Sequence, residues 1–150
     1  LCGPRFQMQF SLHTTDEVRR RELVPARTWS FAEMGDYGRR FHRPGERKVT
    51  LNFATPVGFP LDATVLLENF SPDHFVVKLT PVNPTSKVIA RGLTGRIDPE
   101  QADECKKLVQ RFEAAGYGTI LSIGELEENQ IGSNCGMFVS RVEHSREAAC

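Results

Sequence analysis

The chain contains two kinds of hydrophobic pattern, one that repeats every second residue and one with the spacing of a helix face. Phe6, Met8, Phe10 and Leu12 alternate with polar residues, which is typical of a β-strand with one buried face. Three more short apolar runs have the length and composition of strands, over residues 49–53, 75–80 and 119–123. The pattern therefore predicts four strands that are well separated along the chain.

Helical patterns occupy the intervals between the predicted strands. The best marked begins after Ser30, because Ser30 and Glu33 have the spacing of a capping box, with Trp29 and Met34 placed for a hydrophobic staple. Asp62 is placed to cap a shorter helix. These patterns predict helices over residues 14–23, 30–41 and 63–70.

The last predicted helix has signals at both of its ends. Asp98 is the expected N-cap, Pro99 takes the first helical position, and Gly116 ends the helix. Its apolar face includes Cys105, which is expected to be a small core residue. The segment before this helix, residues 85–97, is predicted to be a polar loop.

The predicted elements follow the order strand, helix, strand, helix, strand, helix, strand. This alternation is typical of a parallel α/β fold with outer helices, either a piece of a (βα) barrel or an open sheet. A chain of 150 residues has the length of one domain, and its 39% of hydrophobic residues is sufficient for a buried core. The sequence therefore predicts one α/β unit with parallel strands.

The charge pattern is uneven along a chain that is neutral as a whole. The 19 basic and 19 acidic side chains give no strong basic excess, which argues against a dedicated nucleic-acid-binding protein. Residues 1–50 hold ten Arg and Lys against six Asp and Glu, and the three arginines at 19–21, like His42 and His74, are expected to be solvated. No run of eighteen apolar residues is present, so no membrane span is expected.

The four cysteines are Cys2, Cys105, Cys135 and Cys150, and no two of them have the C-x-x-C spacing of a metal site. No secretion signal is recognisable, so reduced thiols and a cytoplasmic location are expected rather than disulfides. No residue of the chain is assigned as a metal ligand.

Polar residues of less common kinds follow the predicted strands. Ser11, Leu12 and His13 close the first strand, Asn83 lies between two prolines after the third, and Cys135 lies in a glycine-rich loop after the fourth. In parallel α/β folds the carboxyl ends of the strands share one edge, and binding sites lie there. A plainer interpretation stays open for each residue. His13 can bond a backbone carbonyl, Asn83 can support its own turn, and Cys135 can be an ordinary loop thiol.

Three segments, in this order, resemble motifs of the radical S-adenosylmethionine (SAM) family that contains the RNA adenine methyltransferases RlmN and Cfr. Residues 10–25, FSLHTTDEVRRRELVP, resemble a strand-end motif of the form SLHA…R..L.P. Residues 79–84, LTPVNP, resemble LIPFNP, and residues 131–136, IGSNCG, resemble IDAACG. The resemblance covers residues 6–138, and a barrel portion is expected over residues 1–138. Residues 139–150 are expected to be a polar tail.

The resemblance implies the C-terminal half of a radical SAM partial (βα) barrel. It implies that Ser11, Leu12, His13 and Asn83 contact SAM. It also implies that Cys135 is the catalytic residue, which carries a methyl group from one SAM to an adenine of rRNA or tRNA. In that family a second SAM is cleaved at a 4Fe-4S cluster to give the radical that activates the S-methyl group. The C-x-x-x-C-x-x-C motif of the cluster is absent from this sequence. The cluster ligands and the other half of the barrel are therefore expected upstream, and the chain alone is expected to be inactive.

Two alternatives stay open. Residues 122–128, SIGELEE, are acidic where the family has an arginine-rich strand end, which favours a radical SAM enzyme acting on a protein or a small molecule. A different class of function is a non-catalytic α/β interaction module, with the basic first third and the acidic loop as partner surfaces. The sequence leaves the oligomeric state open.

Overall fold

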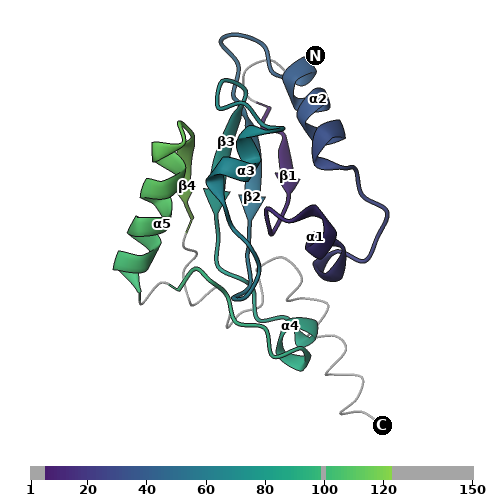
Figure 1. The fold of residues 1–150 in the computed structure, drawn as a ribbon, viewed down its shortest axis with the longest axis vertical. Helices are drawn as coiled ribbons and strands as arrows, with labels where there is room; N and C mark the ends of the chain where they lie inside the picture. Colours follow the sequence, from purple (N-terminus) through teal and green to yellow (C-terminus); the bar gives the residue numbers. More distant parts are fainter. Residues whose placement is uncertain (1–5, 99–100, 123–150) are drawn as a thin grey trace.

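Four parallel strands form the centre of the protein in a computed structural model, which describes residues 6–98 and 101–122. The strands lie in the sheet in their order along the chain, and every neighbouring pair is parallel. They are β1 (Gln9–Ser11), β2 (Val49–Phe53), β3 (Phe75–Leu79) and β4 (Gly118–Leu121). The helices are α1 (Glu17–Leu23), α2 (Phe31–Phe41), α3 (Ala63–Leu67), α4 (Ser86–Ala90) and α5 (Ala102–Ala114) (Figure 1). The predicted parallel α/β fold is confirmed.

One face of the sheet packs against helices and forms the core. Its side chains on the two central strands are all fully buried: Val49, Leu51 and Phe53 from β2, and Phe75, Val77 and Leu79 from β3. The ring of Phe112 on α5 packs against Phe53 with centroids 6.2 Å apart, and Phe70, after α3, packs against Phe75 at 5.1 Å. Burial of such a side chain contributes roughly 1.5–3 kcal/mol, so this face holds the helix layer on the sheet.

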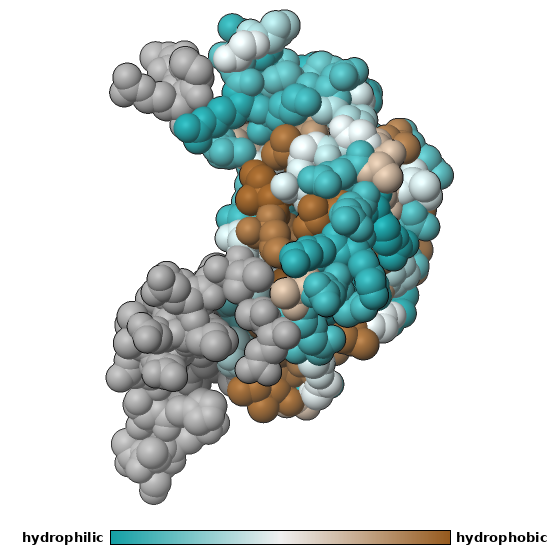
Figure 2. Space-filling view, turned by 90° about the vertical axis from the view of Figure 1, so that its left-hand side faces the viewer, coloured by the Kyte–Doolittle hydropathy of each residue, from teal (hydrophilic) through white to brown (hydrophobic). Residues whose placement is uncertain are grey.

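The alternate side chains point to the opposite face of the sheet, which we call the open face. The strand register places two rows on it: Gln9, Thr50, Val76 and Gly118 in one, and Ser11, Asn52, Lys78 and Ile120 in the other. All of these residues except Thr50 are exposed or half-buried. One side of the molecule is hollowed, and both hydrophobic and hydrophilic residues are exposed in the hollow (Figure 2).

Helix α2 begins as its sequence predicts. The Ser30 side chain accepts a hydrogen bond from the Glu33 N–H, and the Glu33 carboxylate accepts one from the Ser30 N–H, which completes the predicted capping box. Met34 is 2% exposed, whereas Trp29 is 48% exposed, and the Trp29 ring packs against Tyr37 with centroids 5.2 Å apart. Trp29 therefore belongs to an aromatic surface on the outside of α2.

Two glycines allow α2 to approach the core closely. A Cβ atom at Gly35 would lie closer than 3.0 Å to the main-chain oxygen of Asn69, and one at Gly38 would lie closer than 3.0 Å to the Phe75 ring. Glycine in a helix interior costs about 1 kcal/mol relative to alanine. The close packing explains why α2 carries glycine at both positions despite this cost.

Helix α5 begins later than the sequence predicts. Gln101 has φ −105° and ψ 58°, outside the helical region, and the helix starts at Ala102. The Gln101 main-chain and side-chain N–H groups both donate to Asp98, and Gln101 rather than Asp98 is the residue at the N-cap. The predicted C-terminal end is confirmed, because Gly116 has φ +93° directly after the C-cap residue Ala115.

The segment 85–97, predicted to be a polar loop, contains the short helix α4.

Three residues that were expected to be solvated are buried or half-buried: Arg20, His42 and His74. Arg20 is 6% exposed, because main-chain and hydroxyl oxygens surround its guanidinium. His42 and His74 are half-buried, with their Nδ1 atoms 3.0 Å apart. Cys105 is buried in the core, as predicted.

Several sequence predictions lie outside the described residues. They concern Cys135 and its loop, the boundary at residue 138 and the polar tail over 139–150. Within the described residues, every helix is too short or too polar to cross a membrane.

Candidate functional site

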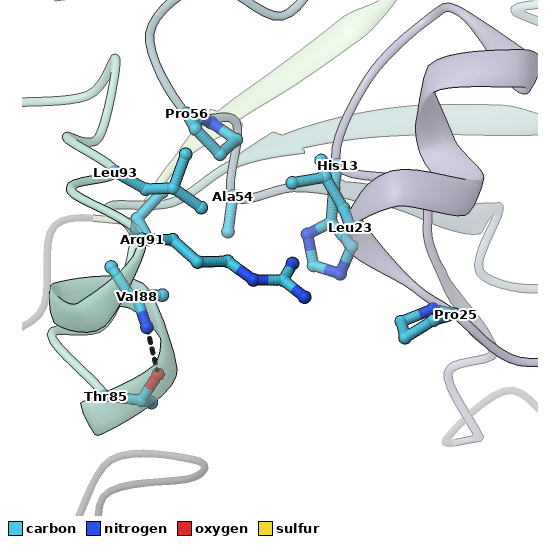
Figure 3. Close-up of a pocket in the computed structure, with 10 residues that line it drawn as sticks. His13, Leu23, Pro25, Ala54, Pro56, Thr85, Val88, Arg91 and Leu93 are labelled. Atoms are coloured by element: carbon cyan, nitrogen blue, oxygen red, sulfur yellow. Dashed lines mark hydrogen bonds between the residues drawn. The ribbon is translucent and has the colours of Figure 1, made fainter.

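A pocket of about 410 Å³ lies at the carboxyl ends of β1, β2 and β3. His13 follows β1, Ala54 follows β2 and Val82 follows β3, so the edge predicted from the sequence is formed by these three strands. Residues in and after α4 close the other side of the pocket (Figure 3). The lining is mostly apolar, and its polar side chains are His13, Thr85 and Arg91. Such a lining is typical of sites for small molecules and cofactors.

The backbone at His13 turns sharply to direct the ring to the pocket. Its φ is +66°, in the left-handed region that costs a residue with a side chain roughly 1–2 kcal/mol. The N–H groups of Leu12 and His13 both donate to the Asn52 carbonyl, at 2.9 and 3.4 Å, which ends the pairing of β1 with β2. Strain of this kind persists where the surrounding structure enforces it, and it is concentrated at ligand sites.

The surroundings of His13 favour its neutral form. Burial lowers the pKa of His13 below its usual 6.5, a hydrogen bond to the Ala54 carbonyl raises the pKa, and the positive charge of Arg20 lowers it further. A neutral imidazole that donates to Ala54 keeps its second ring nitrogen as an acceptor. That nitrogen can accept a hydrogen bond from an N–H or O–H group of a ligand.

Arg20 fixes the strand end that carries His13. Its guanidinium donates to the Ser11 carbonyl at 3.1 Å, to the Thr28 hydroxyl at 2.9 Å and to the Trp29 carbonyl at 3.3 Å. Burial lowers the pKa of Arg20, although an arginine remains charged at ordinary pH. One side chain therefore ties the end of β1 to the segment that leads into α2.

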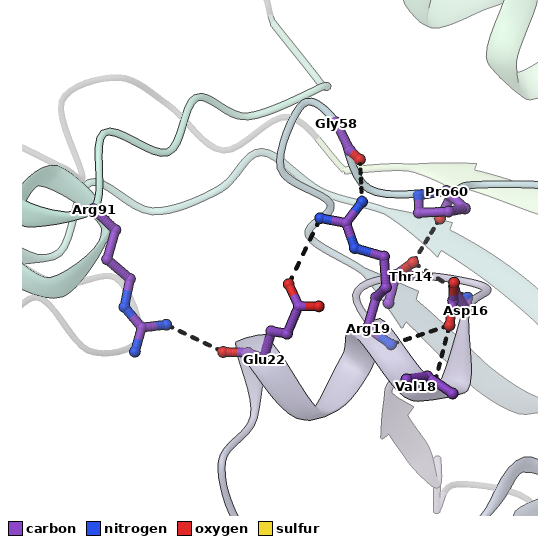
Figure 4. Close-up of polar contacts among 8 residues, drawn as sticks. All are labelled: Thr14, Asp16, Val18, Arg19, Glu22, Gly58, Pro60 and Arg91. Atoms are coloured by element: carbon purple, nitrogen blue, oxygen red, sulfur yellow. Dashed lines mark hydrogen bonds and ion pairs between the residues drawn. The ribbon is translucent and has the colours of Figure 1, made fainter.

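Two arginine side chains, one from α1 and one from the turn after α4, connect α1 to the segments around the pocket. Arg91, which follows α4, extends toward α1 and donates from Nη1 to the Glu22 carbonyl at 3.1 Å (Figures 3 and 4). Arg19 donates to the Gly58 carbonyl at 2.8 Å, and its guanidinium lies 4.2 Å from the centre of the Phe59 ring. These contacts hold α1 against both the loop after β2 and the turn after α4.

The residues predicted to contact SAM lie in different surroundings. His13 lines the pocket, and Asn83 lies between the lining residues Val82 and Thr85, with its carbonyl accepting from the Thr85 N–H at 2.8 Å. Ser11 is exposed at the end of β1, on the open face, and Leu12 is fully buried in the core. The structure thus brings the His13 and Asn83 segments to one edge of the sheet. The fifth predicted residue, Cys135, lies outside the described residues.

The α4 side of the pocket was not predicted from the sequence. Val88, Arg91 and Leu93 line it, and all three lie in the segment predicted to be a polar loop. The apolar residues Val88 and Leu93 could have indicated that this segment packs against the protein. Two apolar residues in a polar stretch do not, however, form the repeating pattern of a helix or a strand. The buried Arg20 was also missed, because three consecutive arginines do not show which of them faces inward.

The described residues do not fit a metal cluster. Within the part of the chain that the structure describes, no three His, Cys, Asp or Glu side chains are close enough together to hold a metal ion. Cys105 is buried, and its Sγ lies 3.4 Å from the Asp98 carbonyl oxygen. Ligands for an iron–sulfur cluster outside the described residues stay a prediction from the sequence.

No family model and no curated protein matches the sequence. The structure is similar to the crystal structure of a radical SAM methyltransferase from Sphaerobacter thermophilus, with a TM-score of 0.69 and 23% sequence identity. The similarity covers 89% of this chain and 38% of that chain, so this chain spans less than half the length of that protein. The chain therefore shares the parallel α/β, partial-barrel fold of part of a radical SAM methyltransferase.

Proposed function

We propose that this chain is the C-terminal portion of the barrel of a radical SAM methyltransferase, and that the pocket beside His13 holds the adenosine part of SAM. The position of the pocket carries the proposal. It lies at the carboxyl ends of three parallel strands, where α/β folds of this kind bind their ligands. The residue that enters it, His13, belongs to the Ser-Leu-His motif of the family resemblance.

The lining of the pocket fits an adenosine group. Its apolar walls suit a planar ring, and the free nitrogen of neutral His13 can accept a hydrogen bond from an amino or hydroxyl group. SAM, when bound, supplies a methyl group and the radical chemistry of its family. In this proposal the residues that line the pocket bind and orient SAM. The described residues include no group of side chains able to hold the cluster.

The finer proposal concerns the substrate and the methyl carrier. The resemblance of residues 131–136 to the family motif supports Cys135 as the residue that carries the methyl group, with an adenine of RNA as its acceptor. The target base would have to leave its stack to reach such a residue, which favours looped RNA. The remaining barrel half and the cluster would lie outside this chain, so we propose that the chain alone does not turn over. We place the reaction in the cytoplasm.

A labelling experiment tests this function in the protein expressed from its natural gene. The protein is reconstituted anaerobically with iron and sulfide and supplied with SAM labelled in its methyl group. We expect label on Cys135 by mass spectrometry and on adenosine in digested RNA. Cys135→Ala should abolish labelling of RNA and leave the affinity for S-adenosylhomocysteine unchanged.

A second measurement tests the pocket. Asparagine also tolerates a positive φ, so His13→Asn should keep the backbone conformation while removing the imidazole ring. This substitution should weaken binding of S-adenosylhomocysteine about ten-fold. A wild-type protein that binds neither SAM nor S-adenosylhomocysteine would refute the proposed function and favour an interaction module. Label on a protein or a small molecule, with none on RNA, would refute the RNA substrate only.

A further inference from the structure

Lys78 carries the only charge in the two described rows of the open face. It lies beside Asn52 and Ser11 in one row, on the neighbouring strands β3, β2 and β1. Neighbouring strands are about 4.8 Å apart, so the three side chains stand next to one another. His13, which lines the pocket, follows Ser11 by two residues, and Ala54, which also lines it, follows Asn52 by two residues, so the row lies next to the pocket.

Lys78 also differs from the other lysines whose side chains the structure describes. Lys48 donates to a main-chain carbonyl, and Lys106 and Lys107 pair with acidic side chains one turn earlier on α5. Within the described residues, Lys78 has neither a hydrogen-bond acceptor nor an ion-pair partner. Lys78 is half-buried and lies at a hollowed face, so its positive charge is available to a bound anion.

The neighbours of Lys78 add further donors. The Asn52 Oδ1 atom accepts a hydrogen bond from the Thr80 hydroxyl at 3.5 Å, which leaves the Asn52 amide N–H groups to act as donors. The Ser11 hydroxyl is a third donor group in the same row. An ammonium, an amide and a hydroxyl in one row match the several acceptor oxygens of a phosphate or carboxylate group.

The balance of charges indicates that the phosphate or carboxylate bound by this row belongs to the substrate and not to SAM. SAM carries a sulfonium cation, and the two described rows contain no Asp or Glu that would balance SAM and Lys78 together. An anionic substrate supplies the missing negative charge. We propose that Lys78, Asn52 and Ser11 bind one phosphate group of a nucleotide substrate on the open face. This proposal rests on the proposed function, which takes the substrate to be RNA.

Two matched pairs of small probes test this subsite in the protein expressed from its natural gene. Adenosine 5′-monophosphate and adenosine differ by one phosphate, and S-adenosylhomocysteine and 5′-methylthioadenosine differ by the amino-acid arm with its carboxylate. The affinity of each probe is measured by calorimetry or ligand-observed NMR. The monophosphate and adenosine are titrated both with and without saturating S-adenosylhomocysteine.

We expect the wild type to prefer the monophosphate to adenosine, and Lys78→Met to reduce that preference about ten-fold. Lys78→Arg should preserve the preference, because it keeps the charge. Lys106→Met, the same substitution on the exposed face of α5, should have no effect. Thermal unfolding of each variant checks that it is folded, and Lys78→Gln serves as a second neutral variant.

Each remaining outcome is decisive. Equal phosphate preference in the wild type, Lys78→Met and Lys78→Gln would overturn the proposal. If Lys78→Met instead removed the preference for S-adenosylhomocysteine over methylthioadenosine, the anion would be the carboxylate of the cofactor and the assignment to substrate would be wrong. A wild type that fails to bind S-adenosylhomocysteine refutes the proposed function, while the titrations without that ligand still decide the role of Lys78.

Discussion

The guanidinium of Arg20 donates from Nη2 to the main-chain carbonyl of Ser11 across 3.1 Å. Ser11 is the last residue of β1, and the strained residue His13 follows two positions later. The same guanidinium reaches Thr28 and Trp29, in the segment before α2. A buried side chain of α1 therefore sets the direction in which the first strand delivers His13 to the pocket.

Replacing Arg20 should destabilise the whole protein. Arg20→Met removes three hydrogen bonds and leaves the Ser11 carbonyl without this donor, so we expect a loss of about 2–3 kcal/mol in the free energy of unfolding. Urea unfolding measures the change. Arg21→Met is the matched control, because Arg21 is exposed and its loss should change stability by less than about 0.5 kcal/mol. Equal effects of the two substitutions would contradict the structural role of Arg20.

The order of strands and helices was predictable because each element carries its own local signal. The alternation in Val49–Phe53 marks a strand by itself, and Ser30 with Glu33 marks the start of α2 by side-chain hydrogen bonds three residues apart. Signals of this kind need no knowledge of the rest of the fold. The parallel arrangement followed from their alternation.

The site was only partly predictable because its remaining residues are brought together by tertiary contacts. Nothing near Arg91 in the sequence shows that it reaches Glu22, which is 69 residues away. The row of Ser11, Asn52 and Lys78 depends on strand register, which the sequence pattern leaves open along the strand direction. His13 could be predicted because it follows a predicted strand and belongs to the Ser-Leu-His motif of the family resemblance.

The packing of α2 can be tested at Gly38. Gly38→Ala would gain about 1 kcal/mol of helix propensity, but the new methyl group would overlap the ring of Phe75, which is fully buried. Overpacking of this kind costs about 1–3 kcal/mol, so we expect net destabilisation in urea unfolding. Ala32→Gly, at an exposed position of the same helix, is the control that measures propensity alone. A Gly38→Ala protein as stable as the wild type, or more stable, would show that α2 is not packed this closely.

The lowered pKa of His13 should make stability depend on pH. Burial is the main cause, so the folded protein binds the imidazole proton less tightly than the unfolded chain, whose histidine has the usual pKa of 6.5. The stability contributed by neutral His13 is therefore fully present above the unfolded pKa, and it is lost as the pH falls toward the folded pKa. Between about pH 7.5 and about pH 5, the urea midpoint of the wild type should fall further than that of His13→Asn. Parallel pH profiles would rule out this linkage, since both proteins share the other histidines.

The contact between Arg91 and the Glu22 carbonyl should affect ligand binding more than stability. Arg91 is exposed, so Arg91→Met should change the free energy of unfolding by less than about 0.5 kcal/mol. Loss of the contact frees the segment around α4 from α1, and we expect faster amide hydrogen exchange over residues 85–93. Because these residues form one wall of the pocket, the affinity for S-adenosylhomocysteine should fall several-fold. Arg40→Met, an exposed arginine on α2, is the control and should alter neither measurement. Unchanged exchange over 85–93 in Arg91→Met would show that the wall is held by other contacts.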